Sequence, residues 1–213
     1  MKILVLSDTH DKLSRVRDIW PKLTDIDLVI HAGDYYMDAR ELEEELGVPF
    51  VYVRGNCDGS YSGENCNPKG GDFAVVETPA GNILVSHGHN EGVHFSLQNL
   101  RYKALENDCF AAVFGHTHKA LVEQHDDPAA PGGSFWFINP GSLSIPRDGS
   151  GGSYAIIRAT EDRFDATVVY YNTVMGSSKG GSSFGGHGGS GGNADDKTSG
   201  STISSILNYV DRF

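Results

Sequence analysis

Short apolar runs that end in glycine or aspartate recur along the first third of the chain. They read "KILVLS" at residues 2–7, "DLVIHAGD" at 27–34 and "FVYVRGNCD" at 50–58. Apolar runs of this length predict strands buried on both faces of a sheet. Residues 12–23 and 38–47 between them have apolar side chains at helical spacing, and Gly47 is a plausible helix stop. The alternation predicts parallel strands joined by right-handed crossovers.

The second half of the chain carries more antiparallel signals. Residues 73–89 predict two strands around a turn at 79–81, and residues 153–160 and 165–171 predict a hairpin. A helix is expected within 94–106, and further strands at 109–116, 120–124 and 134–142. We therefore expect an α/β fold with two sheets packed face to face and helices outside them.

The last part of the chain changes composition abruptly. We expect residues 1–175 to form the main domain, because residues 176–200 are mostly Gly and Ser and predict a flexible tether. Residues 201–213 regain an apolar helical face and predict a short amphipathic helix. This helix is expected to cover its own domain or a second copy of the chain, with residues 203–213 as the contact in a homo-oligomer. A dedicated partner protein is the alternative.

Composition argues against several classes of protein. The formal net charge is −11, from 17 basic and 28 acidic residues, and no basic or aromatic-interleaved run stands out as a nucleic-acid signal. The three cysteines show no CxxC spacing and predict neither a disulfide framework nor a zinc finger. No apolar run approaches the ~18 residues of a membrane span, and the first run is too short for a signal peptide. We expect a cytoplasmic protein without membrane contact.

Polar side chains that bind metals follow five of the predicted strands. They are Asp8 and His10, Asp34, Asn56, His87 and His89, and His116 and His118. In open α/β sheets, ligands bind at the carboxyl ends of the strands, so these side chains are expected to meet at one edge. In "DTH" and "HTH" an extended backbone would point the first and third side chains the same way.

This mixture of ligands indicates a centre with two metal ions. Imidazole with carboxylate suits Mn, Ni, Zn or Fe, and there are more ligands than one tetrahedral ion needs. Two ions about 3.5–4 Å apart that share a carboxylate match the centres of phosphatases and nucleases. The sequence therefore predicts a binuclear centre with two divalent cations, manganese being the first choice.

The ordered motifs DxH, GD, GNCD, HGH and GHTH, with "INPGSLSIPR" at 138–147, resemble the calcineurin-like metallophosphoesterase superfamily and its small YfcE-type phosphodiesterase branch. The resemblance covers residues 1–171. It implies a four-layer α/β/β/α sandwich of two mixed sheets. It also implies two ligand sets, which are Asp8, His10, Asp34 and His118 for one ion, and Asp34, Asn56, His87 and His116 for the other.

The expected reaction is hydrolysis of a small phosphodiester by a hydroxide that bridges the two metals. Asn56, Cys57, Asp58 and His89 are the candidate catalytic residues. Cys57 stands where many members of the family have a histidine that protonates the leaving group; it is either a weak substitute or a small buried residue. Asp58 is expected to orient a neighbouring group. His89 is expected to contact the phosphate or to bind the second nitrogen of His87.

The main alternative is a non-catalytic scaffold for protein partners. The retromer subunit of the same family has this fold and an eroded metal site, whereas every ligand position is filled here. The complete set of ligands favours an enzyme.

Overall fold

The computed structural model describes residues 1–59 and 69–176. Apart from Gly176, the predicted tether and terminal helix lie outside the described residues. The compact unit that carries the predicted site is Met1–Tyr171. Within the described residues, no helix has the length and apolar character of a membrane span.

The first sheet has six strands in the order β11-β10-β1-β2-β3-β4. β1 to β4 run parallel, whereas β10 is antiparallel to β1 and β11 is antiparallel to β10. The strands are Lys2–Leu6 (β1), Leu28–His31 (β2), Phe50–Val53 (β3), Lys69–Gly71 (β4), Ser153–Ala159 (β10) and Phe164–Tyr170 (β11). The carboxyl ends of β1, β2 and β3 therefore lie at the same edge.

The second sheet has five strands in the order β5-β6-β7-β9-β8. β6, β7 and β9 run parallel, and β5 and β8 are antiparallel to their neighbours. The strands are Phe73–Thr78 (β5), Gly81–Ser86 (β6), Cys109–Val113 (β7), Ala120–Asp126 (β8) and Ser134–Pro140 (β9). Both sheets are mixed, as expected from the sequence.

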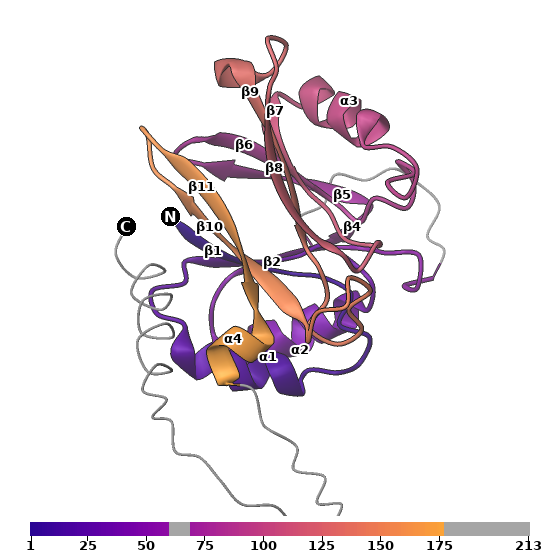
Figure 1. Ribbon diagram of the computed structural model, residues 1–213, viewed down its shortest axis with the longest axis vertical. Helices are drawn as coiled ribbons and strands as arrows, with labels where there is room; N and C mark the ends of the chain where they lie inside the picture. Colours follow the sequence, from indigo (N-terminus) through magenta and orange to yellow (C-terminus); the bar gives the residue numbers. More distant parts are fainter. Residues whose placement is uncertain (60–68, 177–213) are drawn as a thin grey trace, which may run out of the picture. The chain divides into compact units, whose positions relative to one another are not determined.

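The helices lie on the outer faces of the two sheets, as Figure 1 shows for α1 and α2 on one side and α3 on the other. They are Ser14–Ile19 (α1), Tyr36–Leu46 (α2) and Gln98–Glu106 (α3), with 3₁₀ turns at Trp20–Lys22 and Pro131–Gly133. A further helix is formed by Tyr171–Met175 (α4). The helix expected at 12–23 gives way to a 3₁₀ turn after Ile19, because Pro21 has no N–H to donate. α2 ends at Gly47 as predicted, in the left-handed conformation.

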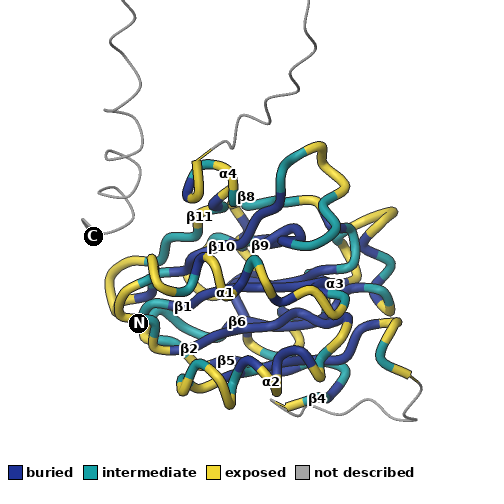
Figure 2. Tube along the Cα trace, turned by 90° about the horizontal axis from the view of Figure 1, so that it is seen from below, coloured by how far each residue is buried: buried dark blue, intermediate teal, exposed yellow. Residues whose placement is uncertain are grey.

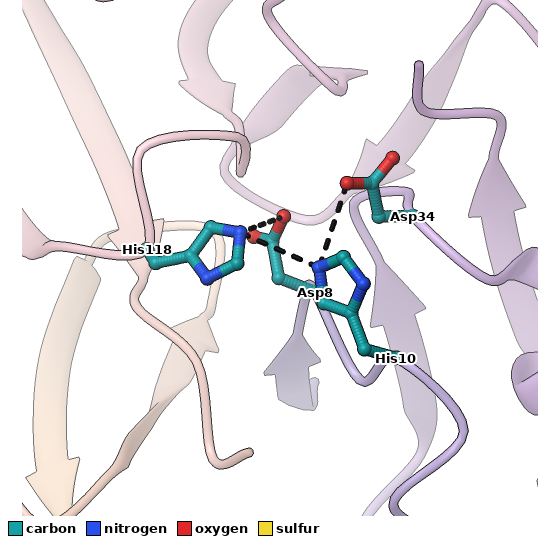
Figure 3. Close-up of side chains that lie close together, drawn as sticks. All are labelled: Asp8, His10, Asp34 and His118. Atoms are coloured by element: carbon teal, nitrogen blue, oxygen red, sulfur yellow. Dashed lines mark hydrogen bonds and ion pairs between the residues drawn. The ribbon is translucent and has the colours of Figure 1, made fainter. Parts of the chain in front are cut away.

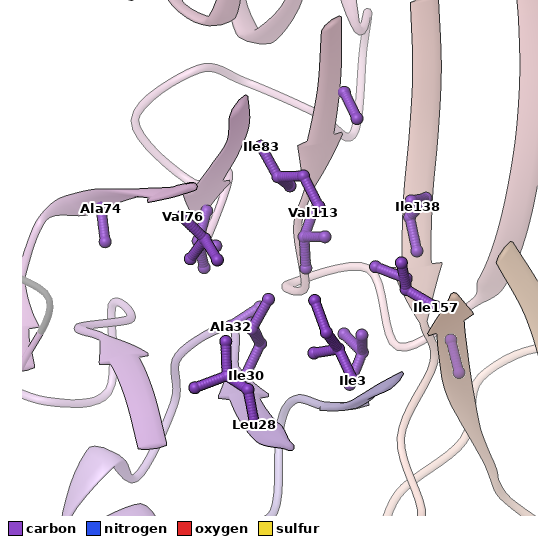
Figure 4. Close-up of a cluster of buried hydrophobic side chains, with 14 of the residues drawn as sticks. Ile3, Leu28, Ile30, Ala32, Ala74, Val76, Ile83, Val113, Ile138 and Ile157 are labelled. Carbon is purple, nitrogen blue, oxygen red and sulfur yellow. The ribbon is translucent and has the colours of Figure 1, made fainter. Parts of the chain in front are cut away.

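Apolar side chains from the two sheets meet in one core. Ile3 and Ile30 from the first sheet pack with Ile83, Val113 and Ile138 from the second (Figure 4). Figure 2 shows the strands buried and the helices exposed on their outer sides. The layers are helix, sheet, sheet and helix, so the expected four-layer sandwich is confirmed.

Candidate metal centre

Every predicted metal ligand lies in a loop that follows one of five strands. Asp8 and His10 come after β1, Asp34 after β2 and Asn56 after β3. His87 follows β6, and His116 and His118 follow β7. Because β1, β2 and β3 run parallel, and β6 and β7 do so in the other sheet, the topology gathers these loops.

Asp8, His10, Asp34 and His118 form a compact group (Figure 3). One ligand atom from each side chain lies within 4.8 Å of those of the others. The His118 Nε2 atom is 3.2 Å from Asp8 Oδ1 and 3.4 Å from His10 Nε2. The His10 Nε2 atom is 3.6 Å from Asp34 Oδ2. All four side chains thus point to one small volume.

A second group adjoins the first through Asp34. The His87 Nε2 atom is 3.1 Å from Asn56 Oδ1 and 3.4 Å from Asp34 Oδ1. The ring of His116 lies beside that of His87, with 5.1 Å between centroids. One carboxylate oxygen of Asp34 therefore faces His10, and the other faces His87.

Backbone carbonyls orient two of the histidines. Nδ1 of His87 donates to the carbonyl of Ala32 at 2.8 Å, and Nδ1 of His118 donates to that of Ile145 at 2.7 Å. A neutral imidazole that donates from Nδ1 has its lone pair on Nε2, the atom that points into the centre. Both rings are therefore held in the tautomer that a metal requires.

The electrostatics of the first group suit a divalent cation. Asp8 Oδ1 is buried 3.2 Å from His118 Nε2, without a hydrogen bond of regular geometry among the described residues. Burial raises the pKa of Asp8, but the neighbouring imidazoles of His118 and His87 outweigh it and hold the pKa below its usual range. Burial lowers the pKa of His118, and Asp8 reverses this effect, so the net shift is upward. A cation would supply the positive charge that this carboxylate lacks.

The backbone at the "DTH" and "HTH" motifs, residues 8–10 and 116–118, differs from the prediction. Asp8 and His10 have φ of 55° and 48°, and His116 and His118 have φ of 66° and 56°. These are left-handed conformations, so the expectation of an extended chain was wrong. The first and third side chains converge because the backbone turns sharply after each strand.

Two of the glycines that precede ligand loops stand where a side chain would collide with a neighbouring residue. A Cβ atom on Gly115 would clash with Ser7 Oγ and lie 2.8 Å from Asp8 Oδ2. A Cβ atom on Gly33 would lie 2.6 Å from Nδ1 of His87. Glycine stands shortly after β2 and β7 because a ligand that follows a strand of the other sheet packs directly against the backbone there.

Asp58 binds backbone rather than a histidine. Its Oδ1 accepts the N–H groups of Tyr35 at 2.7 Å and Tyr36 at 3.1 Å, and its Oδ2 accepts that of Gly55 at 2.7 Å. It thereby ties the loop after β3 to the loop that carries Asp34. The group that it orients is the backbone of both loops.

The Cys57 side chain is exposed, so the alternative of a small buried residue was wrong. Its backbone N–H donates to Asp34 Oδ1 at 2.9 Å. Partial desolvation of the sulfur and the neighbouring Asp34 and Asp58 raise the pKa of the thiol to about 11. The thiol is therefore protonated at neutral pH and is a weak acid.

His89 does not bind the second nitrogen of His87, because the Ala32 carbonyl occupies that position. The two rings lie 5.3 Å apart, and Nδ1 of His89 is buried without a hydrogen bond among the described residues. Burial and the neighbouring His87 lower the pKa of His89, which keeps the ring neutral. Of the two predicted roles, contact with the phosphate is the one left.

Sequence reasoning missed two histidines. His94 was expected in a helix, but α3 begins only at Gln98, and the His94 ring lies 4.5 Å from that of His116. A third histidine so soon after "HGH" was the available signal. His31 was read as a strand residue; it is fully buried beneath the centre, and burial lowers its pKa to about 4.

Comparison with known proteins agrees with this geometry. Residues 1–162 match the calcineurin-like phosphoesterase superfamily domain. The chain belongs to this superfamily. It is therefore a metal-dependent phosphoesterase with a candidate metal-binding cluster.

Two curated relatives are similar over most of their length. The probable metallophosphoesterase YsnB of Bacillus subtilis is 33% identical, over 81% of this chain and 91% of its own. The phosphodiesterase YfcE of Escherichia coli is 29% identical, over 74% and 87%. The predicted resemblance to the YfcE-type branch is confirmed.

Solved structures share the fold. A predicted phosphoesterase from Streptococcus pneumoniae matches with a TM-score of 0.62 and 26% identity, over 80% of this chain and 90% of its own. Vps29 of Entamoeba histolytica complexed with zinc matches with a TM-score of 0.58 and 17% identity, over 81% and 100%. The second likeness concerns the fold alone.

Proposed function

We propose that this chain hydrolyses small phosphodiesters at a centre of two divalent metal ions. The observation that carries the proposal is the position of Asp34, whose two oxygens face two different groups of ligands, 3.6 Å from His10 and 3.4 Å from His87. A carboxylate shared in this way is typical of two-metal hydrolytic sites.

The two cations would share Asp34. Asp8, His10 and His118 would complete the site of one ion, and Asn56, His87 and His116 that of the other. Imidazole and carboxylate ligands together suit manganese, nickel, zinc or iron, and we take manganese as the first choice. When bound, the two ions activate a water molecule as the nucleophile and offset the charge on the phosphoryl oxygens.

The surrounding side chains determine which substrates react well. His89, whose ring lies 5.3 Å from that of His87, would contact a phosphoryl oxygen. Cys57 is a poor proton donor for the leaving oxygen, since its pKa is about 11. Substrates with a good leaving group, such as aryl diesters, should therefore react fastest.

The protein is first freed of metal with a chelator and then supplied with Mn²⁺, Ni²⁺, Zn²⁺ or Fe²⁺ in turn. The test measures its hydrolysis of the diester bis-p-nitrophenyl phosphate and of the monoester p-nitrophenyl phosphate. We expect metal-dependent cleavage of the diester, and a loss of roughly 10²-fold or more in Asn56→Ala and His116→Ala. His125→Ala is the matched control, because this histidine is exposed and pairs only with Glu123 and Phe137 among the described residues. Equal activity in all three variants would contradict the proposal.

The alternative is a partner-binding scaffold without activity. The likeness to Vps29 concerns only the fold, and the complete group of ligands around Asp34 favours catalysis. Failure to cleave either substrate with any metal, in a chain that still binds metal, would favour the scaffold.

A further inference from the structure

The loop after β1 has a strained backbone. Asp8, His10 and Asp11 all have φ between 48° and 58°, a region that residues with a Cβ atom avoid. Two of these three residues are proposed ligands. Contacts outside the loop must hold this conformation, because such strain persists only where the surroundings fix it.

Thr9, between the two ligands, makes such a contact. Its side chain is buried, with 1% exposed, and its Oγ1 lies 3.0 Å from Nε2 of His31 at the end of β2. Asp38, in the first turn of α2, holds the next part of the loop. Asp38 Oδ2 accepts the N–H of Asp11 at 2.9 Å. The loop is therefore attached to both β2 and α2.

His31 has no other role that the described contacts explain. It is 0% exposed, its Nδ1 has no hydrogen-bond partner among the described residues, and its Nε2 contacts only Thr9. Burying a polar ring that makes a single hydrogen bond costs free energy, and this cost points to a purpose for the bond.

We propose that His31, through the Thr9 hydroxyl, and Asp38, through the Asp11 N–H, hold Asp8 and His10 in the left-handed turn that aims both side chains at a cation. They are positioning residues for the group Asp8, His10, Asp34 and His118. This inference rests on the proposed function, since it assigns a purpose to residues next to the proposed ligands.

The test compares Thr9→Val, which keeps the shape of the side chain but removes the hydroxyl, with Thr9→Ser, which keeps the hydroxyl. Calorimetric titration of chelated protein with Mn²⁺ alone measures the affinity of each site. We expect Thr9→Val to weaken one of two sites by about 10- to 100-fold. Thr9→Ser should stay within about threefold of the parent chain. Thr78→Val is the control, because it removes a hydroxyl that bonds the Gly81 carbonyl in the distant β5–β6 turn.

The inference is overturned if Thr9→Val binds Mn²⁺ as tightly as Thr78→Val, or if Thr9→Ser weakens binding as much as Thr9→Val. If circular dichroism shows that Thr9→Val does not fold, Asp38→Ala, which removes the acceptor of the Asp11 N–H, decides instead. We expect it to weaken the same site at least about threefold, and an unchanged affinity overturns the inference. If the parent chain binds two Mn²⁺ ions and cleaves the diester, and the variants bind Mn²⁺ as tightly as the parent, the result counts against this inference alone. A parent chain that binds no Mn²⁺ counts against both proposals.

Discussion

A single methyl group on Gly33 should displace His87. Gly33 has φ of +94°, and an added Cβ atom would lie 2.6 Å from His87 Nδ1 and 2.9 Å from His87 Cβ. The His87 ring is completely buried and hydrogen-bonded to Ala32, so it has no free space to move into. Gly33→Ala should therefore destabilise the fold and weaken metal binding together.

The cost has two parts. A residue with a Cβ atom in left-handed backbone costs about 1–2 kcal/mol, and forcing an extra carbon into a packed site costs about 1–3 kcal/mol more. The sum is about 2–5 kcal/mol. At about 2–4 °C per kcal/mol for a chain of this size, the melting temperature should fall by roughly 4–20 °C.

Gly47→Ala is the matched control. Gly47 also has a positive φ, +69°, but nothing lies within 4 Å of an added Cβ atom. Only the backbone cost of about 1–2 kcal/mol applies, and Mn²⁺ affinity should not change. The assay is thermal unfolding of the metal-free variants by circular dichroism, with Mn²⁺ titration of each. Equal losses of stability, with normal Mn²⁺ binding by Gly33→Ala, would refute the reasoning.

Three further predictions concern buried or shielded side chains. The pKa of His31 is about 4 in the folded protein and 6.5 in the unfolded chain. Between these values the unfolded chain binds a proton that the folded protein does not, so the stability linked to His31 is fully present above pH 6.5 and is lost as the pH falls toward 4. From pH 7 to pH 5, His31 should contribute about 2 kcal/mol to the drop in the unfolding free energy of the metal-free protein in urea, and His31→Phe should reduce the drop by about that amount. The buried amide of Asn139 binds the Gly115 carbonyl, the Thr117 hydroxyl and the Gly141 N–H, so Asn139→Ala should lower the free energy of unfolding in urea by about 2–4 kcal/mol. A decrease below about 1 kcal/mol would argue against this. In a variant whose other cysteines are replaced by serine, the rate of Cys57 alkylation by iodoacetamide should keep rising with pH up to about 11. If the rate instead reaches half its maximum near pH 8.5, about the pKa of an ordinary thiol, Asp34 does not raise the pKa of Cys57.

The strands and the ligands could be predicted because their signals are local. An apolar run that ends in glycine or aspartate gave the bounds of β1, β2 and β7 closely, and the polar residues after each run proved to lie together. Parallel topology alone brings the ends of such strands to one edge. Sequence spacing therefore carried most of the information about the centre.

What could not be predicted depends on contacts between distant segments. β4, with the sequence Lys69–Gly71, has no apolar run and is a strand because it pairs with β3. The left-handed turn at Asp8 and His10 depends on Thr9, β2 and α2, and no local pattern announces it. His31 looked like an ordinary strand residue because its role depends on a partner 22 positions away.

Electron paramagnetic resonance of chelated protein loaded with two equivalents of Mn²⁺ tests the shared Asp34 most directly. Two ions bridged by one carboxylate should give an exchange-coupled spectrum, and Asp34→Asn should reduce it to the signal of separate ions. A parent chain that binds only one Mn²⁺, or two that remain magnetically independent, would contradict the binuclear centre.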